Sequence, residues 1–388
     1  MKKFRFRGVA AVIGVVASLA MGARAAAPSG VRIMLAAGEG AGAPVGDAAM
    51  TRVRKALPLA AETVSGRAMP PAPGEGEQAV YAFFPDVAYT VTVTRVEAVF
   101  GDTLLVHGSC GAAGDARFSS TLAPDGFLHE VHDFKRGMLY QASGRADGSL
   151  EIREYDDAKR LRVWDEPAVT FSAGAEGTGP GVNQMTAAAA PAASAATVID
   201  VMLVFDTTAQ TWVSANGGAT AFANAAVAKM NAALANSGVD CTYRLVHVMS
   251  TGYTYSGAYS TDLNALRAGT GSLSAVTEAR NTYGADLVSM MVDTGSAYGS
   301  TGLGDMPVNT AGWDMGAFSV CAIRSVSISH TLTHEIGHNL GCGHSKYQAN
   351  TPGPSKVFTY AAGWYFTGNN SVRYNTIMAY YTDGTYSG

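Results

Sequence analysis

The sequence predicts an α/β chain in which a β-rich N-terminal part precedes a domain built on a mostly parallel, twisted sheet. Short runs of β-branched and aromatic residues follow one another between about residues 80 and 170. From residue 197 onward, strand-length and helix-length apolar patterns alternate, which is typical of parallel sheets. Late in the chain, His334, Glu335 and His338 have the spacing of an amphipathic helix.

Length and composition are consistent with two modest domains. The chain has 388 residues, 47% of them hydrophobic, which is enough to bury a sizeable core. Its 27 basic and 31 acidic residues give a net charge of -4, so charge favours neither nucleic acid nor an anionic membrane as a partner. We expect no nucleic-acid binding and no integral membrane association.

The amino terminus predicts a signal peptide over residues 1–25. Four basic residues precede an apolar run from about 9 to 21, and Ala23-Arg24-Ala25 then supplies an A-x-A cleavage site. The apolar run is shorter than the ~20 residues that a spanning helix needs. We therefore expect a secreted protein, with a retained signal anchor as the alternative.

The next segment, 26–171, is predicted to be a propeptide with a β-rich domain over about 80–170. Strand-like runs at 89–93, 103–107 and 149–152 are separated by the turn signals Asp125-Gly126 and Asp147-Gly148. Residues 172–196 are rich in Gly, Ala and Pro and almost free of charge. They predict a linker, and they are the expected region of proteolytic maturation.

Residues 197–388 are predicted to form the second, catalytic domain. A buried central strand is expected at 198–205, further strands at 242–248 and 286–292, and helices at about 208–237 and 263–283. A Gly-rich stretch, 299–316, precedes an apolar run at 317–320, which we expect at or near the edge of the sheet.

The segment from His334 to His344 predicts a metal site. Residues four apart share a helix face, so His334 and His338 can each place a ring nitrogen about 2.0–2.1 Å from one zinc ion. Gly341 can adopt the positive φ that ends a helix and returns the chain, so that His344 becomes a third ligand.

Glu335 is predicted to be the catalytic base. Zinc lowers the pKa of a water molecule to about 7, and a neighbouring carboxylate can accept that proton and later pass it to the leaving amine. The alternative is a set of ordinary helix histidines. By chance, however, the full pattern would arise on the order of 10⁻⁵ times in a chain of this composition. A decayed enzyme is a second alternative, against which the intact Glu335 argues.

The run from His334 to His344 resembles the elongated zinc motif of the metzincins, H-E-x-x-H-x-x-G-x-x-H. Asn375-Thr376-Ile377-Met378-Ala379-Tyr380 is similar to their Met-turn, and residues 197–388 resemble the reprolysin-like (adamalysin-like) branch. The resemblance implies a zinc metalloendopeptidase made as a zymogen. It also implies a hydrophobic floor at Met378 and a catalytic role for Tyr380 beside the developing oxyanion, for which plain packing is the alternative.

Two departures from that branch lie close to the motifs. Ser345 stands where the branch commonly has Asp, and no cysteine precedes Met378. His330, four residues before His334, could share the helix face of the ligands. We expect it to start the helix or to support a ligand instead, because three histidines and water fill a tetrahedral site.

Four cysteines allow few pairings. Cys241, Cys321 and Cys342 would give the catalytic domain one disulfide and one odd thiol, with the choice of pair open. Cys110, followed by Gly111, resembles the propeptide cysteine with which several metzincins occupy the open position of zinc. An ordinary unpaired cysteine is the alternative.

The sequence as a whole predicts an endopeptidase that hydrolyses internal peptide bonds of proteins, which it would bind as an added strand. One rival is a zinc amidase, or a peptidase restricted to one protein or glycoprotein. A rival from another class is a secreted binding module with an inactive zinc site. Structural Ca²⁺ is not indicated by any motif.

Overall fold

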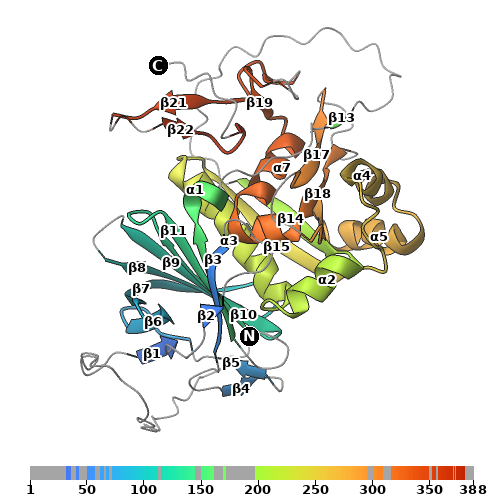
Figure 1. Ribbon diagram of the computed structural model, residues 1–388. Helices are drawn as coiled ribbons and strands as arrows, with labels where there is room; N and C mark the ends of the chain where they lie inside the picture. The colour runs from blue at the N-terminus through green and yellow to red at the C-terminus, as the bar shows by residue number, and fades with distance from the viewer. Residues whose placement is uncertain are drawn as a thin grey trace, which may run out of the picture.

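The computed structural model describes most of the chain (Figure 1). The described residues are 32–35, 41–42, 50–56, 62–64, 67–69, 72–111, 115–144, 150–160, 169–171, 197–295, 300–308, 316–348, 352–354, 357–369, 371 and 373–380. The expected signal peptide at 1–25 and the expected linker at 172–196 lie outside them.

The N-terminal half is a ten-stranded sheet with the order β1-β6-β7-β8-β9-β10-β11-β12-β3-β2. All neighbours in it are antiparallel except β1 and β6. Its strands are β1 (Arg32–Leu35), β2 (Ala41–Gly42), β3 (Met50–Ala56), β6 (Gln78–Phe84), β7 (Val87–Val99), β8 (Thr103–Cys110), β9 (Ala116–Ala123), β10 (Gly126–Asp133), β11 (Met138–Gly144) and β12 (Leu150–Asp156). The hairpin β4 (Glu62–Val64) and β5 (Arg67–Met69) and the short helix α1 (Asp157–Arg160) complete this half.

The core of this half is explained by side chains that are alternately more and less buried along the strands. In β10, burial alternates from Leu128 to Asp133, so one face of the strand meets the core and the other is less covered. Tyr81, Phe118 and Phe127 are among the buried rings. The predicted strands at 89–93 and 103–107 fall in β7 and β8, and the described part of the one at 149–152 falls in β12. The turn at Asp125 and Gly126 joins β9 to β10, whereas the turn signal at 147–148 lies outside the described residues.

The C-terminal half contains a six-stranded sheet with the order β13-β17-β18-β16-β14-β15. Its pairings are parallel except that of β17 with β18. The strands are β13 (Val169–Phe171), β14 (Thr197–Phe205), β15 (Cys241–Ser250), β16 (Leu287–Val292), β17 (Gly302–Pro307) and β18 (Phe318–Ala322). The chain therefore has the mixed α/β architecture expected from the sequence, although its largest sheet is the antiparallel one.

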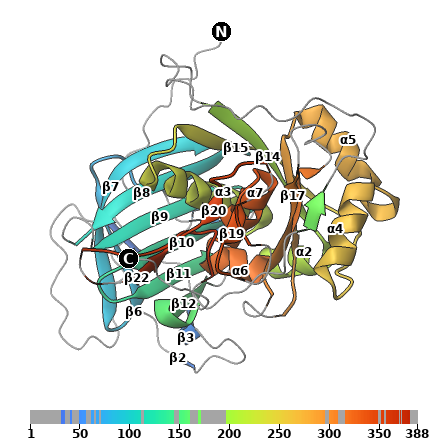
Figure 2. The same ribbon diagram turned by 90° about the horizontal axis from the view of Figure 1, so that it is seen from above.

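Helices cover both faces of the six-stranded sheet. Alternate residues of β14 enter two separate cores: Val201 and Leu203 pack with one group of helices, and Met202 and Val204 with the other. The first group is α2 (Thr207–Ser214), α3 (Ala219–Asn236), α6 (Ile323–Ile328) and α7 (Thr331–Asn339). The second group is α4 (Tyr259–Ala268), η1 (Gly271–Leu273) and α5 (Ser274–Tyr283), visible at the right of Figure 2.

Glycines divide both of the long helices that the sequence predicts. The helix expected at 208–237 is α2 and α3, separated by Gly217 and Gly218, whose φ angles are 108° and 89°. The helix expected at 263–283 starts earlier and ends at Gly269, where φ is 57°, before α5 begins. A positive φ is incompatible with a continuing helix, so Gly217 and Gly218 separate α2 from α3, and Gly269 is the C-cap of α4.

The position of β18 corrects a further expectation. The run at 317–320 was expected at or near the sheet edge, but β18 lies between β16 and β17. The Gly-rich stretch before it contains β17, which carries no β-branched residue and so lacks the usual strand signal. Both β17 and β13 therefore lie between β18 and the edge of the sheet.

Two small sheets follow α7. They pair β19 (Gly343–Ser345) with β20 (Ala362–Gly363), and β21 (Tyr365–Thr367) with β22 (Arg373–Asn375). Both lie beyond the C-terminal end of α7, at the top of Figure 1. Within the described residues, no helix has the length and apolar character needed to cross a membrane.

Candidate active site

Helix α7 carries the histidine motif and is fixed firmly to the sheet. His330 occupies its N-cap position, and the backbone N–H of His334 donates to the His330 carbonyl at 2.9 Å. At the other end, the Asn339 side-chain amide donates to the backbone carbonyls of Asp305, at 2.9 Å, and Phe318, at 2.8 Å. The two Asn339 hydrogen bonds join α7 to β17 and β18, so the helix cannot shift along the sheet without breaking them.

The three predicted ligands converge. The Nε2 atoms of His334, His338 and His344 lie 3.0–3.1 Å from one another, and all three residues are buried. Gly341 has φ of 86°, so the chain turns back after α7 as expected and brings His344 to the pair. Three imidazole nitrogens this close fit a single ion with ligands at about 2.0–2.1 Å. His330 is outside this group, in agreement with its expected place at the helix start.

Backbone carbonyls orient two of the ligand rings. Nδ1 of His334 lies 2.6 Å from the Ile377 carbonyl oxygen, and Nδ1 of His338 lies 2.8 Å from that of Cys342. Because a carbonyl only accepts, each Nδ1 carries the hydrogen and each Nε2 keeps its lone pair for a metal. The two rings are thus held in the tautomer that a ligand requires.

Glu335 is fully buried against β17. A Cβ atom added at Gly302 would lie 2.7 Å from Cδ of Glu335, and one at Gly304 would lie 3.1 Å from Cβ of His338. Any larger residue at these alternating positions would displace the helix or the carboxylate. This role of the two glycines was not predicted from the sequence, although Gly302 and Gly304 have the spacing of one strand face, which could have indicated it.

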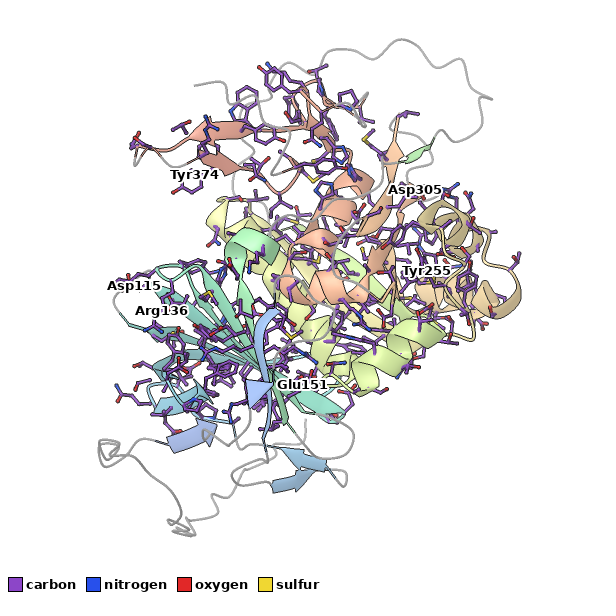
Figure 3. The ribbon with its side chains drawn as sticks, viewed as in Figure 1. Asp115, Arg136, Glu151, Tyr255, Asp305 and Tyr374 are labelled. Carbon is purple, nitrogen blue, oxygen red and sulfur yellow. The ribbon has the colours of Figure 1, made fainter. Side chains whose placement is uncertain are left out.

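An ion pair with one buried partner lies on the other face of the same strand. Asp305 is fully buried, and its Oδ2 accepts from Nε of Arg267 on α4 at 3.2 Å. Burial raises the pKa of Asp305 to about 6, and the Arg267 guanidinium limits the rise. Asp305 is a residue of β17 and is labelled in Figure 3. The pair anchors the face of β17 opposite the one that carries Gly302 and Gly304.

The Met-turn residues pack beneath and beside the histidines. Met378 lies against α7 at Gly337, where an added Cβ would be 3.1 Å from Met378 Cε. The ring of Tyr380 lies 4.6 Å from that of His344, centroid to centroid, and Tyr380 is buried. Gln348 fixes this segment, because its Oε1 accepts from the Tyr380 backbone N–H at 2.9 Å. No sequence signal pointed to Gln348.

Residues 195–387 match the model of the reprolysin-type family described as Metallo-peptidase family M12. The domain belongs to metallopeptidase family M12. It is a metalloendopeptidase of the metzincin type, as the motifs implied, and the family implies a zinc cofactor. The donor set of three buried, converging imidazoles fits zinc, which favours nitrogen ligands in tetrahedral sites.

The chain has relatives among curated proteins. A peptidyl-Asp metalloendopeptidase of Xanthomonas campestris pv. campestris is 27% identical over 75% of this chain and 68% of its own length. A peptidyl-Asp metalloendopeptidase of Stenotrophomonas maltophilia is 31% identical over 40% of this chain, and the match spans 35% of that relative.

Among solved structures, metalloproteinase-II from Bacteroides fragilis matches 73% of this chain and 86% of its own, with a TM-score of 0.46 and 10% identity. A chaperone-substrate complex matches 48% of this chain and 28% of its own, with a TM-score of 0.35 and 18% identity. Neither likeness is close enough to establish a shared fold.

The cysteines differ from expectation. No two of the four, all of which lie within the described residues, are joined in a disulfide, so the predicted bridge in the M12 domain is wrong. In the sheet order, β16 and β14 separate Cys321 on β18 from Cys241 on β15, farther apart than a disulfide reaches.

Cys110 lies in the hydrophobic core of the N-terminal half, 2% exposed, and burial raises the pKa of its thiol to about 11. It does not belong to the cluster of His334, His338 and His344. The resemblance to a zinc-blocking thiol is therefore wrong. Cys110 is a core residue.

Proposed function

We propose that this protein is a secreted zinc endopeptidase, made as a zymogen, in which Glu335 is the general base. The observation that carries the proposal is the convergence of His334, His338 and His344 at Nε2 separations of 3.0–3.1 Å, next to the buried Glu335, in a family M12 domain. Zinc, when bound, supplies Lewis acidity that polarises a carbonyl group and lowers the pKa of water.

The protein's own residues would perform the remaining steps. The Glu335 carboxylate would accept a proton from the attacking water and deliver it to the leaving amine, since it adjoins the first ligand and does not itself need to bind metal. Gly302 and Gly304 leave room for that carboxylate beside β17. Tyr380, whose ring packs on His344, would donate its hydroxyl hydrogen to the developing oxyanion.

The names of the relatives support a further proposal about substrate. The proteins from Xanthomonas campestris and Stenotrophomonas maltophilia are both described as peptidyl-Asp metalloendopeptidases. We infer that this enzyme cleaves protein substrates at aspartyl residues. Mass spectrometry of peptides released from a mixture of denatured proteins tests this, and cleavage sites without any enrichment of aspartate would reject it.

Secretion and latency form one proposal because both depend on the N-terminal segments. The basic and apolar pattern of residues 1–25 supports export, and the composition of residues 172–196 supports cleavage there. The first residue of the active form, identified by N-terminal sequencing, should lie within 172–196. A first residue well before 160, or one inside β14, would contradict the proposed maturation site.

Glu335→Gln is the variant that tests the proposed chemistry. Activity on a denatured protein should fall by about 10²–10⁴-fold while the zinc content stays at one ion per chain, because the base is lost and the ligands are not. Glu278→Gln, at an exposed position on α5, is the matched control and should hydrolyse at the wild-type rate. A Glu335→Gln enzyme at near wild-type rate would show that another group is the base.

The ligands require a separate test. His334→Ala, His338→Ala and His344→Ala should each lose zinc together with activity, since two imidazoles do not hold the ion as three do. Chelation of the wild-type enzyme should have the same effect, and added zinc should restore the rate. Full zinc occupancy in all three variants would overturn the assignment.

A further inference from the structure

Strand β17 lies against Glu335 and His338 of α7, and one of its edges faces away from β18. One edge of β17 pairs with β18, and one face carries Gly302 and Gly304 against α7. An extended peptide that adds to this sheet beside Glu335 would use the backbone N–H and C=O groups of the other edge. That edge is therefore where a bound substrate and the sheet would meet.

A segment of the same chain already occupies the edge. Strand β13 runs parallel to β17, with Val169 opposite Asp305, Thr170 opposite Met306 and Phe171 opposite Pro307. Figures 1 and 2 show it as a short green strand beside β17. It directly precedes residues 172–196, so cleavage there would leave β13 attached to the N-terminal half and not to the M12 domain.

We propose that β13 is an inhibitory strand that holds the peptide-binding edge of β17 until the N-terminal half leaves. The inference rests on the proposed endopeptidase function and specifies how the zymogen is kept silent. A substrate and β13 compete for the same backbone groups, so inhibition is competitive and needs no ligand to the metal. The burial of Cys110 in the core of the other half is consistent with latency of this kind.

The two halves are joined by partly buried hydrogen bonds that a cut in 172–196 would not break. Asp125 accepts hydrogen bonds from the first turn of α3, at 2.7 Å from the Thr220 N–H. Asn224 on α3 donates to the Phe100 carbonyl at 3.0 Å. Through these contacts the cut N-terminal half would stay bound and keep β13 at a high effective concentration near β17.

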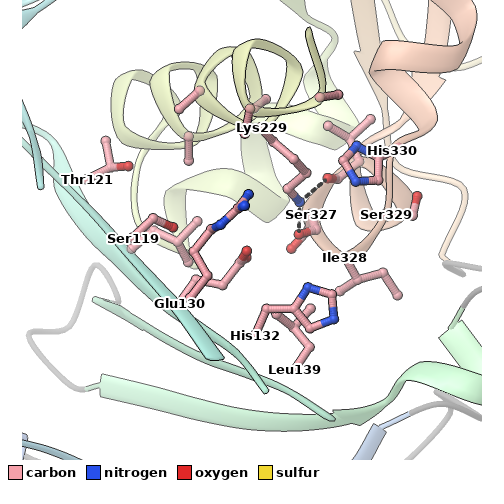
Figure 4. Close-up of a pocket in the computed structure, with 18 of the residues that line it drawn as sticks. Ser119, Thr121, Glu130, His132, Leu139, Lys229, Ser327, Ile328, Ser329 and His330 are labelled. Atoms are coloured by element: carbon pink, nitrogen blue, oxygen red, sulfur yellow. Dashed lines mark hydrogen bonds between the residues drawn. The ribbon is translucent and has the colours of Figure 1, made fainter. Parts of the chain in front are cut away.

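The interface is nevertheless incompletely packed. A cavity of about 190 Å³ lies between α3 and the face of the ten-stranded sheet (Figure 4). Its lining includes Glu130 and His132 from the sheet, and Lys229 and His330 from the M12 domain. Packing contacts are lost wherever such a space remains, so the halves adhere less tightly than a filled core would. Because the hydrogen bonds between the halves survive cleavage, cleavage alone leaves the enzyme inhibited. Because the interface is incompletely packed, the halves can then separate, and their separation activates the enzyme.

Thr170→Pro in the full chain, cut within 172–196, tests the proposal. Proline removes a backbone N–H and its ring clashes with a neighbouring strand, so β13 should detach while the rest of the molecule is unchanged. Compared with the cut wild-type chain at the same concentration, the apparent KM for a peptide substrate should fall by roughly tenfold or more, with kcat and zinc content unchanged. Thr170→Val, which keeps the backbone N–H, is the matched control and should behave as wild type.

A synthetic peptide of residues 165–175 provides a second measurement. Added to the cut Thr170→Pro chain, it should raise KM and leave kcat unchanged, whereas the same peptide with Thr170→Pro should do neither. Equal KM for the Thr170→Pro and wild-type cut chains, with both hydrolysing in a zinc-dependent way, would overturn the inhibitory strand and leave the proposed function intact. Absence of hydrolysis by both chains at every dilution would instead reject the proposed function.

Discussion

Gly302 faces the carboxylate of Glu335 so closely that a Cβ atom at this position would lie 2.7 Å from Glu335 Cδ. The strand and the helix are held at this separation by Asn339, which binds the Asp305 and Phe318 carbonyls. The Glu335 side chain therefore fits at this position only because residue 302 is a glycine and has no side chain.

Gly302→Ala should displace that carboxylate. We expect activity to fall toward the ~10²–10⁴-fold loss that accompanies removal of a general base, with zinc content preserved. Steady-state kinetics and metal analysis of the activated enzyme measure both quantities. Gly252→Ala is the matched control, because the nearest atom to a Cβ there, Ser272 Cβ, lies 3.7 Å away. Wild-type activity in Gly302→Ala would refute the positioning role.

The variant Tyr380→Phe distinguishes a catalytic role of the Tyr380 hydroxyl from a packing role of its ring. The ring would still pack on His344, so zinc and fold should be retained, and kcat should fall by about 10²-fold if the hydroxyl stabilises the oxyanion. The kcat of the activated variant, measured alongside its zinc content, decides between the two roles. An unchanged kcat would leave Tyr380 as a packing residue only.

Asp125→Ala should destabilise the precursor by about 1 kcal/mol, because the N-cap residue of α3, Gly218, has no side chain and Asp125 supplies the cap instead. Urea unfolding of the uncut chain provides the free energy of unfolding. Asp125→Asn should lose less, since asparagine also accepts from a helix N-terminus. Equal stability of Asp125→Ala and wild type would show that water replaces the cap without loss.

His129 should make the N-terminal half sensitive to acid. Burial lowers the pKa of this fully buried imidazole to about 3, against about 6.5 in the unfolded chain. A depressed histidine pKa means that its contribution to stability is complete above about pH 6.5 and is lost as the pH falls toward 3. The loss by pH 5 is about 2 kcal/mol.

The measurement is the change in unfolding free energy between pH 7 and pH 5 for the uncut chain and for His129→Gln. The variant should show a smaller change, because glutamine does not titrate and the other groups are common to both proteins. If the two proteins lose the same free energy on acidification, His129 does not contribute to the pH dependence.

Local spacing along the chain was enough to predict the metal site. His334 and His338 are one helical turn apart and Gly341 ends that helix, so the arrangement follows from backbone geometry once α7 forms. The strands at 198–205, 242–248 and 286–292 were also predictable from local sequence, because each is a stretch of strand length rich in β-branched, aromatic or other apolar residues.

Tertiary structure alone decided the surroundings of that site. The pairing of β13 with β17 joins residues more than a hundred positions apart, and the cap that Asp125 gives to Thr220 on α3 spans 95 positions. The burial of Cys110 and the hydrogen bond that the Tyr380 N–H donates to Gln348 likewise depend on which segments meet in space. Such contacts are selected by packing and by the need to satisfy buried backbone groups over the whole fold. Neither requirement leaves a periodic mark in the sequence of either partner.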